Sequence, residues 1–235
     1  MKQRQNSFKK HTLLTRLGAV AKRVIGGLPV LGVFTTFLGK KIRWFALKAR
    51  IKYRSKKMGL PVDKVYQVDP NRIVFCTPLE VSPFKKIGIV EGGDWDKTDI
   101  KFEDLDIFQA MKKRYFENGE WNQTIFYKNI LQKINNGETL WSCRSEADLI
   151  TRLQKIDQLF QDIKQNGYKS QLDLSGGKLR QSIENIDEIS VNIGRNGEIL
   201  FNNSAHRLAI AKLLKVKKVP VTVTMWHSES LGTKI

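Results

Sequence analysis

The chain has 235 residues, of which 41 are Lys or Arg and 23 are Asp or Glu, so its formal net charge is +18. Hydrophobic residues make up 41% of it, which suffices for one domain of medium size and excludes a wholly disordered chain. Its two cysteines, Cys76 and Cys143, exclude a disulfide framework and lack the spacing of a metal site. We therefore expect a reducing, cytoplasmic location.

The excess positive charge is confined to the start of the chain. Residues 1–57 contain sixteen Lys or Arg and no Asp or Glu, whereas residues 58–235 contain 25 basic and 23 acidic residues, a net charge of +2. A Gly and a Pro at positions 59 and 61 mark the change. The pattern predicts a basic arm over residues 1–57 and a single domain over residues 58–235.

Within the basic arm, apolar residues recur at helical spacing over residues 12–25, which predicts a basic amphipathic helix. The uncharged run over residues 24–39 is shorter than the roughly 20 residues that cross a bilayer, and basic residues follow it, unlike a secretory signal. We expect the arm to lie on an anionic membrane surface; binding to nucleic acid, an organellar targeting signal and a solvated tail are the alternatives. The predicted contact residues are Arg16, Lys22, Arg23, Lys40, Lys41, Arg43 and Trp44.

The domain opens with a predicted strand and an Asp-Pro turn over residues 65–73. A second apolar run, over residues 87–90, leads into the acidic glycine turn Glu91-Gly92-Gly93-Asp94-Trp95-Asp96. Two carboxylates two residues apart can converge on Mg²⁺ or act as a base, so Asp94 and Asp96 are candidate metal-binding or catalytic residues. The alternative for this segment is a solvated surface loop.

The middle of the domain is predicted to be helical. Helices are expected over about residues 103–116, 122–134 and 145–166, the last starting at the capping pattern Ser145-x-x-Asp148 and stopping at Asn166-Gly167. Together they predict a helical insertion over about residues 103–168 whose apolar stripes pack beside a small sheet.

Residues 188–226 predict one compact unit. Apolar residues alternate over 189–193, Arg195-Asn196-Gly197 has the composition of a hairpin turn, and a second strand follows over 199–201. Ser204 is then expected to cap a short helix, and a strand follows over 219–223. The chain as a whole thus predicts an α/β (α+β) fold with a small mixed sheet.

The start of that short helix is a candidate anion site. A helix N-terminus collects unpaired backbone N–H groups and a partial positive charge. Arg207 has the donors to grip a phosphate, and His206 can donate, accept or exchange a proton near neutral pH. Asn203, Ser204, His206 and Arg207 are therefore the predicted phosphate-binding residues, and His206 is also a candidate catalytic residue; two ordinary surface side chains are the alternative at 206 and 207.

These residues resemble the ParB/sulfiredoxin-like superfamily, in which a hairpin ends at an Arg-containing turn and is followed by a helix with small residues and a Val-Pro-Val strand. The opening strand and Asp-Pro turn are also similar. The resemblance implies a small α/β fold that binds nucleotide phosphates at the Arg207 turn, with ATP or CTP and Mg²⁺ as the expected ligands.

Two positions depart from that pattern. Ser204 stands where most members have glycine, and Ala205 stands where sulfiredoxins carry a reactive cysteine and ParB-type CTPases and free-serine kinases carry a glutamate. Because alanine can neither attack nor activate a nucleophile, we expect binding without turnover. The alternatives are a small-molecule kinase or other phosphotransferase, in which Asp94, Asp96 or Glu91 replaces the missing acid, and a nucleic-acid-binding protein that uses the basic arm.

Overall fold

The computed structural model describes residues 45, 46, 49, 51–57, 59, 64–78, 87–174 and 188–231. The chain divides into two compact units, Met1–Arg50 and Ile51–Ile235. The predicted contact residues of the basic arm, Arg16 to Trp44, lie outside the described residues. No helix within the described ranges is long and apolar enough to cross a membrane.

The second unit begins earlier than the charge pattern indicated. Residues 51–57 are helical, Ile51 is buried, and the Arg54 guanidinium donates a hydrogen bond to the carbonyl of Ile87. The end of the predicted arm therefore belongs to the domain, and the boundary falls at Ile51 rather than at Met58. Lys and Arg side chains do not prevent such packing, because their aliphatic stems can cover apolar surface while their charged ends stay in water.

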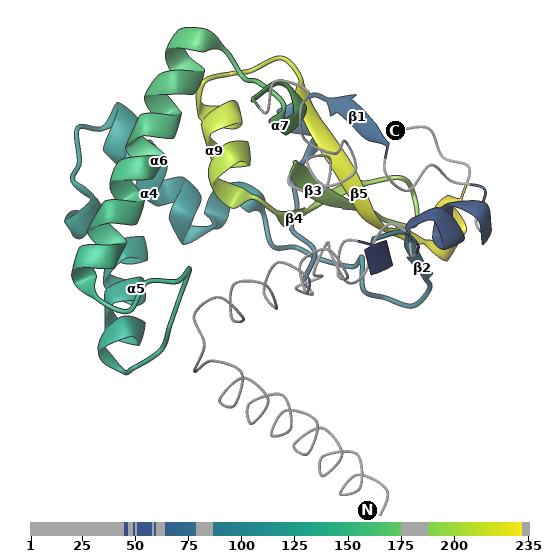
Figure 1. Cartoon of the computed structure of the whole chain (residues 1–235), viewed down its shortest axis with the longest axis horizontal. Coiled ribbons are helices and arrows are strands. Elements are labelled where there is room, and N and C mark those ends of the chain that lie inside the picture. The colour runs from purple at the N-terminus through teal and green to yellow at the C-terminus, as the bar shows by residue number, and fades with distance from the viewer. Residues whose placement is uncertain are drawn as a thin grey trace, which may run out of the picture. The chain divides into compact units, whose positions relative to one another are not determined.

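A mixed five-stranded sheet forms one side of this unit (Figure 1). Its central strand is β5 (Val219–His227), which is buried along its whole length. On one edge of β5 lie β1 (Val65–Val68), antiparallel, and β2 (Ile89–Glu91), parallel. On the other edge lies β3 (Ile189–Ile193), parallel to β5, with β4 (Ile199–Asn203) antiparallel beyond it. The predicted α+β class is confirmed.

The β3–β4 hairpin forms as its turn residues predicted. Gly197 has φ +85°, and its N–H donates to the carbonyl of Gly194 at 3.0 Å. A positive φ at this position is accessible to glycine without a Cβ clash. The hairpin fixes which residues lie at each end of β3, and both candidate sites are found at those ends.

The helical insertion consists of α4 (Asp106–Phe116), α5 (Ile125–Asn135) and α6 (Glu146–Asn166), and the short α7 (Gln171–Leu174) follows it. Helix α6 has the predicted limits: the Ser145 hydroxyl accepts a hydrogen bond from the N–H of Asp148, and the helix stops at Gly167, with φ +75°. Most of its apolar stripe is buried, as predicted, but Ile150 is exposed.

Helix α9 (Ala205–Leu213) lies between the sheet and the helices of the insertion (Figure 1). Its central residues Leu208, Ala209, Ile210 and Ala211 have no exposed surface. Because small and branched apolar residues alternate here, α9 can contact α4, α6 and β3 at once. The N-terminus of α9 is thereby held at a fixed position beside α6.

Candidate anion-binding site

The junction of β4 and α9 is a backbone turn in a left-handed conformation. Ser204 has φ +75° and ψ +47°, a region that most residues avoid and that glycine adopts readily. Its hydroxyl makes no capping bond and instead donates to the carbonyl of Glu188 at 3.3 Å. Ser204 is therefore at the predicted N-cap position, but the predicted side-chain cap is wrong, because a left-handed backbone turns the hydroxyl away from the helix.

Without a side-chain cap, the first turn of α9 keeps unpaired donors. No described residue accepts a hydrogen bond from the backbone N–H of Ala205 or His206, while the N–H of Ser204 is taken by the Asn203 side chain at 2.7 Å. Free N–H groups at a helix N-terminus, together with the helix dipole, favour an anion.

Arg207 borders this junction but is held by the protein itself. Its guanidinium pairs with Glu188 at 3.2 Å, donates to the carbonyl of Lys169 at 3.0 Å and lies over the Tyr168 ring, 5.0 Å from its centroid. The Glu188 side chain is 1% exposed, and burial raises the pKa of its carboxyl group while Gln171 and Arg207 oppose the rise. Arg207 thus stabilises a buried carboxylate, and the phosphate contact expected of it remains a prediction.

His206 has an orphaned nitrogen. Its Nε2 is buried without a hydrogen-bond partner in the described part of the chain, and its ring packs against Trp141 in a T-shaped arrangement, with the ring centroids 5.0 Å apart. Burial, together with the charge of Arg152, lowers the pKa of His206 to about 4. The imidazole is therefore neutral near pH 7. A buried polar atom without a hydrogen-bond partner is uncommon in proteins, which singles out His206 among the residues at this junction.

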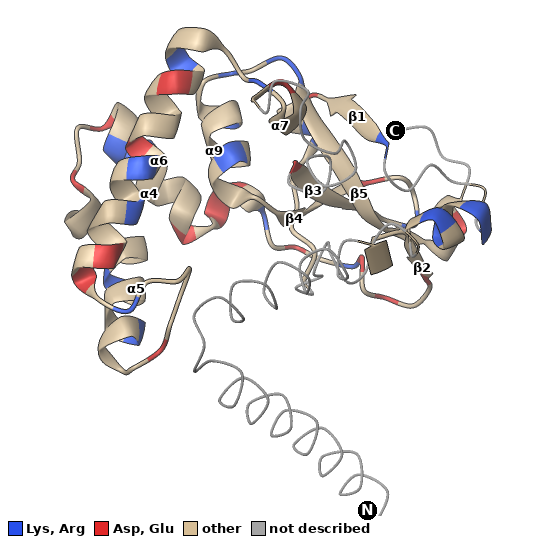
Figure 2. Ribbon diagram, viewed as in Figure 1, with Lys and Arg blue, Asp and Glu red and all other residues tan. Residues whose placement is uncertain are grey.

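An open cavity of about 530 Å³ lies over the N-terminus of α9. Helix α6 supplies two cations to it, Arg152 and Lys155, which are three residues apart and so share one helix face. Figure 2 shows basic positions on both α6 and α9. The lining residues contain no Asp or Glu; they are Trp141, Arg152, Lys155, Ile156, Leu159, Asn203, Ser204, Ala205, His206 and Arg207.

The two α6 cations lack acidic partners. Neither Arg152 nor Lys155 forms an ion pair with any residue that the structure describes, although the Arg152 guanidinium lies 5.5 Å from the centroid of the Trp141 ring. Sequence reasoning missed both, because α6 was interpreted as a packing helix. One signal was available: Lys155 has no acid three or four residues away on either side.

Asp94 and Asp96 lie elsewhere. Both bind Arg195, with Asp94 at 2.8 Å and Asp96 at 2.7 Å, and Asp94 also pairs with Lys97 at 2.9 Å. Arg195 follows the end of β3, whereas Glu188 precedes its start, and a five-residue strand is about 17 Å long. The structure therefore does not bring these acids to Arg207, and a single pocket that combines phosphate and cation ligands is not formed.

The Arg195 cluster is closed by its own hydrogen bonds. The Asp96 side chain is 4% exposed, and hydrogen bonds from Arg195 hold the pKa of its carboxyl group well below the ordinary value. His227 is buried beside it: its Nε2 bonds the carbonyl of Gly93 at 2.9 Å, and its Nδ1 accepts from the N–H of Glu229. Within the described ranges, no three His, Cys, Asp or Glu side chains are grouped so that they could hold a metal ion.

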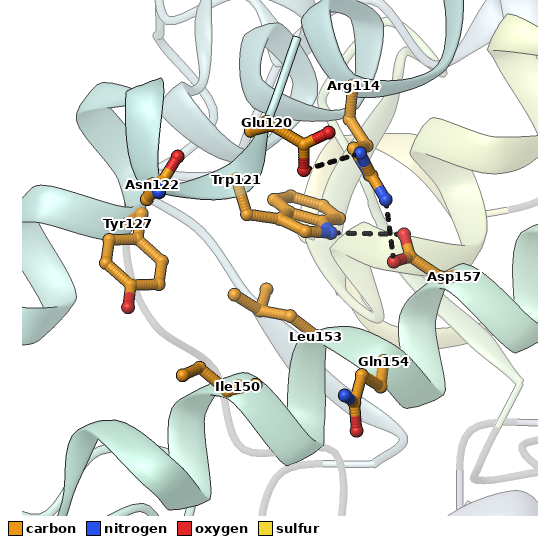
Figure 3. A pocket seen from close by; sticks show the side chains of 9 residues that line it. All are labelled: Arg114, Glu120, Trp121, Asn122, Tyr127, Ile150, Leu153, Gln154 and Asp157. Carbon is orange, nitrogen blue, oxygen red and sulfur yellow. Dashed lines mark hydrogen bonds and ion pairs between the residues drawn. The ribbon is translucent and has the colours of Figure 1, made fainter. Parts of the chain in front are cut away.

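A second cavity, of about 250 Å³, lies between α6 and the segment before α5 (Figure 3). There Arg114 pairs with Glu120 at 2.8 Å and with Asp157 at 3.4 Å, and Asp157 also accepts from the indole of Trp121 at 3.1 Å. These bonds join α4 to α6, and with one cation between two carboxylates the cluster does not favour an anion.

Comparisons with protein-family models, curated proteins and solved structures found no match to the chain. Inferences about function therefore depend on the residues and geometry above. Of the predicted site residues, Asn203, Ser204, His206 and Arg207 share one cavity, and Asp94 and Asp96 belong to a separate cluster at the other end of β3.

Proposed function

We propose that the protein binds a phosphate-bearing small molecule, such as a nucleotide, in the cavity at the N-terminus of α9. The observation that carries this proposal is the pair Arg152 and Lys155, two cations without acidic partners that border a cavity free of carboxylates. The unpaired N–H groups at the start of α9 add hydrogen-bond donors at the same place.

Electrostatics favour this use of the cavity. Two like charges on one helix face repel each other, and the lining of the cavity contains no carboxylate that would offset them, which favours a positive field there. An anion would relieve that repulsion and accept hydrogen bonds strengthened by the charge of the donors. A phosphate fits these demands better than a neutral ligand does.

Membership of the ParB/sulfiredoxin-like superfamily is part of the proposal. It is supported by the order of hairpin, left-handed turn, helix and central strand, and by Ser204 adopting the backbone conformation that a glycine would favour. In this proposal Mg²⁺ would arrive with ATP or CTP, since Asp94 and Asp96 are occupied by Arg195 and Lys97.

Binding without turnover is the form of the proposal that the site chemistry favours. Ala205 has no group that can act as a base, and no carboxylate borders the cavity. A kinase or other phosphotransferase would need Asp94, Asp96 or Glu91 beside the ligand, and all three lie toward the far end of β3 and β5. Incubation of the protein with ATP or CTP and candidate acceptors, followed by product analysis, tests this alternative directly.

Calorimetric titration with ATP, CTP and pyrophosphate tests the binding. We expect the double variant Arg152→Ala/Lys155→Ala to lose at least about tenfold in affinity, because charge-assisted hydrogen bonds contribute roughly 1.5–3 kcal/mol each. The matched control, Lys128→Ala/Lys164→Ala, removes the same charge from exposed positions of α5 and α6 that do not border the cavity. Equal losses in both variants would mean that only net charge matters, and no binding by the unaltered protein would refute the proposal.

The basic arm is proposed to attach the protein to an anionic membrane surface. Residues 1–50 contain twelve basic residues, no acid and an apolar run too short to span a bilayer, a composition typical of such segments. Flotation with anionic and neutral vesicles, compared with retention on RNA or DNA over a range of salt, separates this proposal from nucleic-acid binding. Preferential retention on nucleic acid would favour the alternative.

A further inference from the structure

The turn before α6 holds an aromatic residue in an unfavourable backbone conformation. The N–H of Cys143 donates to the carbonyl of Leu140 at 2.7 Å, and the two residues between them, Trp141 and Ser142, have φ +50° and +64°. Positive φ at both central positions is the pattern of a type I′ turn, which normally uses Asn-Gly. A tryptophan and a serine there each cost roughly 1–2 kcal/mol.

Such strain persists only where the surroundings hold the residue in place, and it concentrates at ligand sites. The Trp141 ring is fixed from three directions: Phe126 lies 5.2 Å away, His206 meets it edge-on at 5.0 Å, and Arg152 lies over it at 5.5 Å. The side chain nevertheless remains 37% exposed, and it borders the cavity. The strained turn thus presents an indole to the space above α9.

The cavity has two chemically different sides. Arg152, Lys155 and the start of α9 form a cationic side, whereas Trp141, Ile156 and Leu159 form an apolar side. Its volume of about 530 Å³ lies within the 300–1,000 Å³ typical of small-molecule sites. A phosphate alone would satisfy the cations and leave the apolar side in contact with water.

We propose that Trp141 makes the site selective for anions whose phosphate is attached to a planar ring, over anions without one. This inference rests on the proposed anion-binding function. It concerns the part of the ligand that Arg152 and Lys155 do not contact. The ring packs against Trp141 and the aliphatic side chains of α6 while its phosphate meets Arg152, Lys155 and the N–H groups of α9. A nucleobase and a simple aryl group share this chemistry.

Titration calorimetry with four ligands tests the proposal: AMP and phenyl phosphate carry rings, and ribose 5-phosphate and inorganic phosphate do not. The unaltered protein is expected to prefer the two ringed ligands. Loss of a stacking residue typically costs about 1–3 kcal/mol, so Trp141→Ala should weaken their binding by about 5- to 150-fold. Its effect on the two ringless ligands should stay within about threefold. A greater loss for AMP than for phenyl phosphate would identify a nucleobase as the ring.

Three further variants distinguish the loss of an aromatic contact with the ligand from a loss of folded structure. Trp141→Phe keeps a ring and should retain the preference, whereas Trp141→Leu keeps an apolar side chain and should lose it, each in protein whose circular dichroism shows it folded. Ser142→Gly relieves the neighbouring left-handed residue and should leave all four affinities unchanged while raising the melting temperature.

Equal binding of ringed and ringless ligands by the unaltered protein would overturn this inference and leave the proposed function intact. An equal loss of affinity for all four ligands in Trp141→Ala would also overturn this inference, because it would mean that Trp141 only positions Arg152 and does not contact the ring of the ligand. Absence of binding by any of the four ligands, pyrophosphate or the nucleotides would overturn the proposed function and this inference together.

Discussion

The two ends of β3 contain similar residues in opposite states. At one end, Arg195 is bound by Asp94 and Asp96, and the nearby His227 has both ring nitrogens engaged. At the other end, Arg152 and Lys155 have no acidic partner among the described residues, and Nε2 of His206 is orphaned. Both ends contain Arg and His, but Arg195 is paired with carboxylates whereas Arg152 and Lys155 are not.

This contrast shows why composition alone does not identify a site. The acidic glycine turn attracts attention in the sequence because carboxylates and glycines are common in metal and phosphate sites. In the folded chain, Asp94 and Asp96 of this segment pair with Arg195 in the turn of the β3–β4 hairpin. The candidate site is instead found where charges and donors are left unsatisfied, and such a deficit exists only in three dimensions.

Arg207→Ala is expected to have the largest effect on stability. Removing the cation leaves the Glu188 carboxylate buried without a charged partner, which typically costs 3–5 kcal/mol. Urea unfolding at pH 7 measures the loss, and Arg207→Ala/Glu188→Gln should recover most of it. Because burial already raises the pKa of Glu188, the loss should shrink as the pH falls and the carboxyl group takes up a proton. A stable single variant with weakened anion binding would instead make Arg207 a direct ligand contact.

Asp96→Asn should cost about 2–3 kcal/mol, less than Arg207→Ala, because Arg195 keeps Asp94 as a partner. The pKa of Asp96 is lowered in the folded protein, so its contribution is present above about pH 4 and is lost as the pH falls further. The variant should therefore lose less stability than the unaltered protein on acidification, as followed by thermal unfolding from pH 6 to pH 2. The affinity of the α9 cavity for anions should not change in this variant. A change would mean that the Arg195 cluster and the cavity, at opposite ends of β3, are energetically coupled.

His206 should make stability fall between pH 7 and pH 5 by about 2 kcal/mol. Unfolded histidine takes up a proton below about pH 6.5, whereas folded His206, with a pKa of about 4, does not, so the unfolded state binds more protons in this window. His206→Asn should flatten that part of the profile. A bound anion should also flatten it, because the anion favours protonated His206. An identical profile in the variant would contradict the burial of this ring.

Ser204→Gly should have the smallest effect, a stabilisation of about 0.5–1 kcal/mol, because glycine adopts φ +75° without a Cβ clash. Ser145→Gly is the matched control: Ser145 has φ −144° and caps α6, so the same substitution should destabilise by a few tenths of a kcal/mol. Chemical denaturation of both variants measures the difference. Destabilisation in both would mean that the bond from Ser204 to the Glu188 carbonyl outweighs the strain.

Sequence reasoning succeeded where the information is local. The limits of α6 follow from a capping serine and an Asn-Gly stop within a few residues of each end, and the β3–β4 turn follows from its own three residues. It failed for the cap of α9, because the pattern around Ser204 does not reveal that its backbone is left-handed.

The sequence by itself determined the α+β class and the order of hairpin, helix and strand over residues 188–226. It also placed Asn203, Ser204, His206 and Arg207 together at the start of a helix. Only the tertiary structure decided which charges meet. It placed Glu188 against Arg207, Arg195 against Asp94 and Asp96, and Arg152, Lys155 and Trp141 around one cavity. The physical reason is range: caps and turns depend on neighbours a few residues apart, whereas the pairing of a charge depends on contacts between segments far apart in the chain.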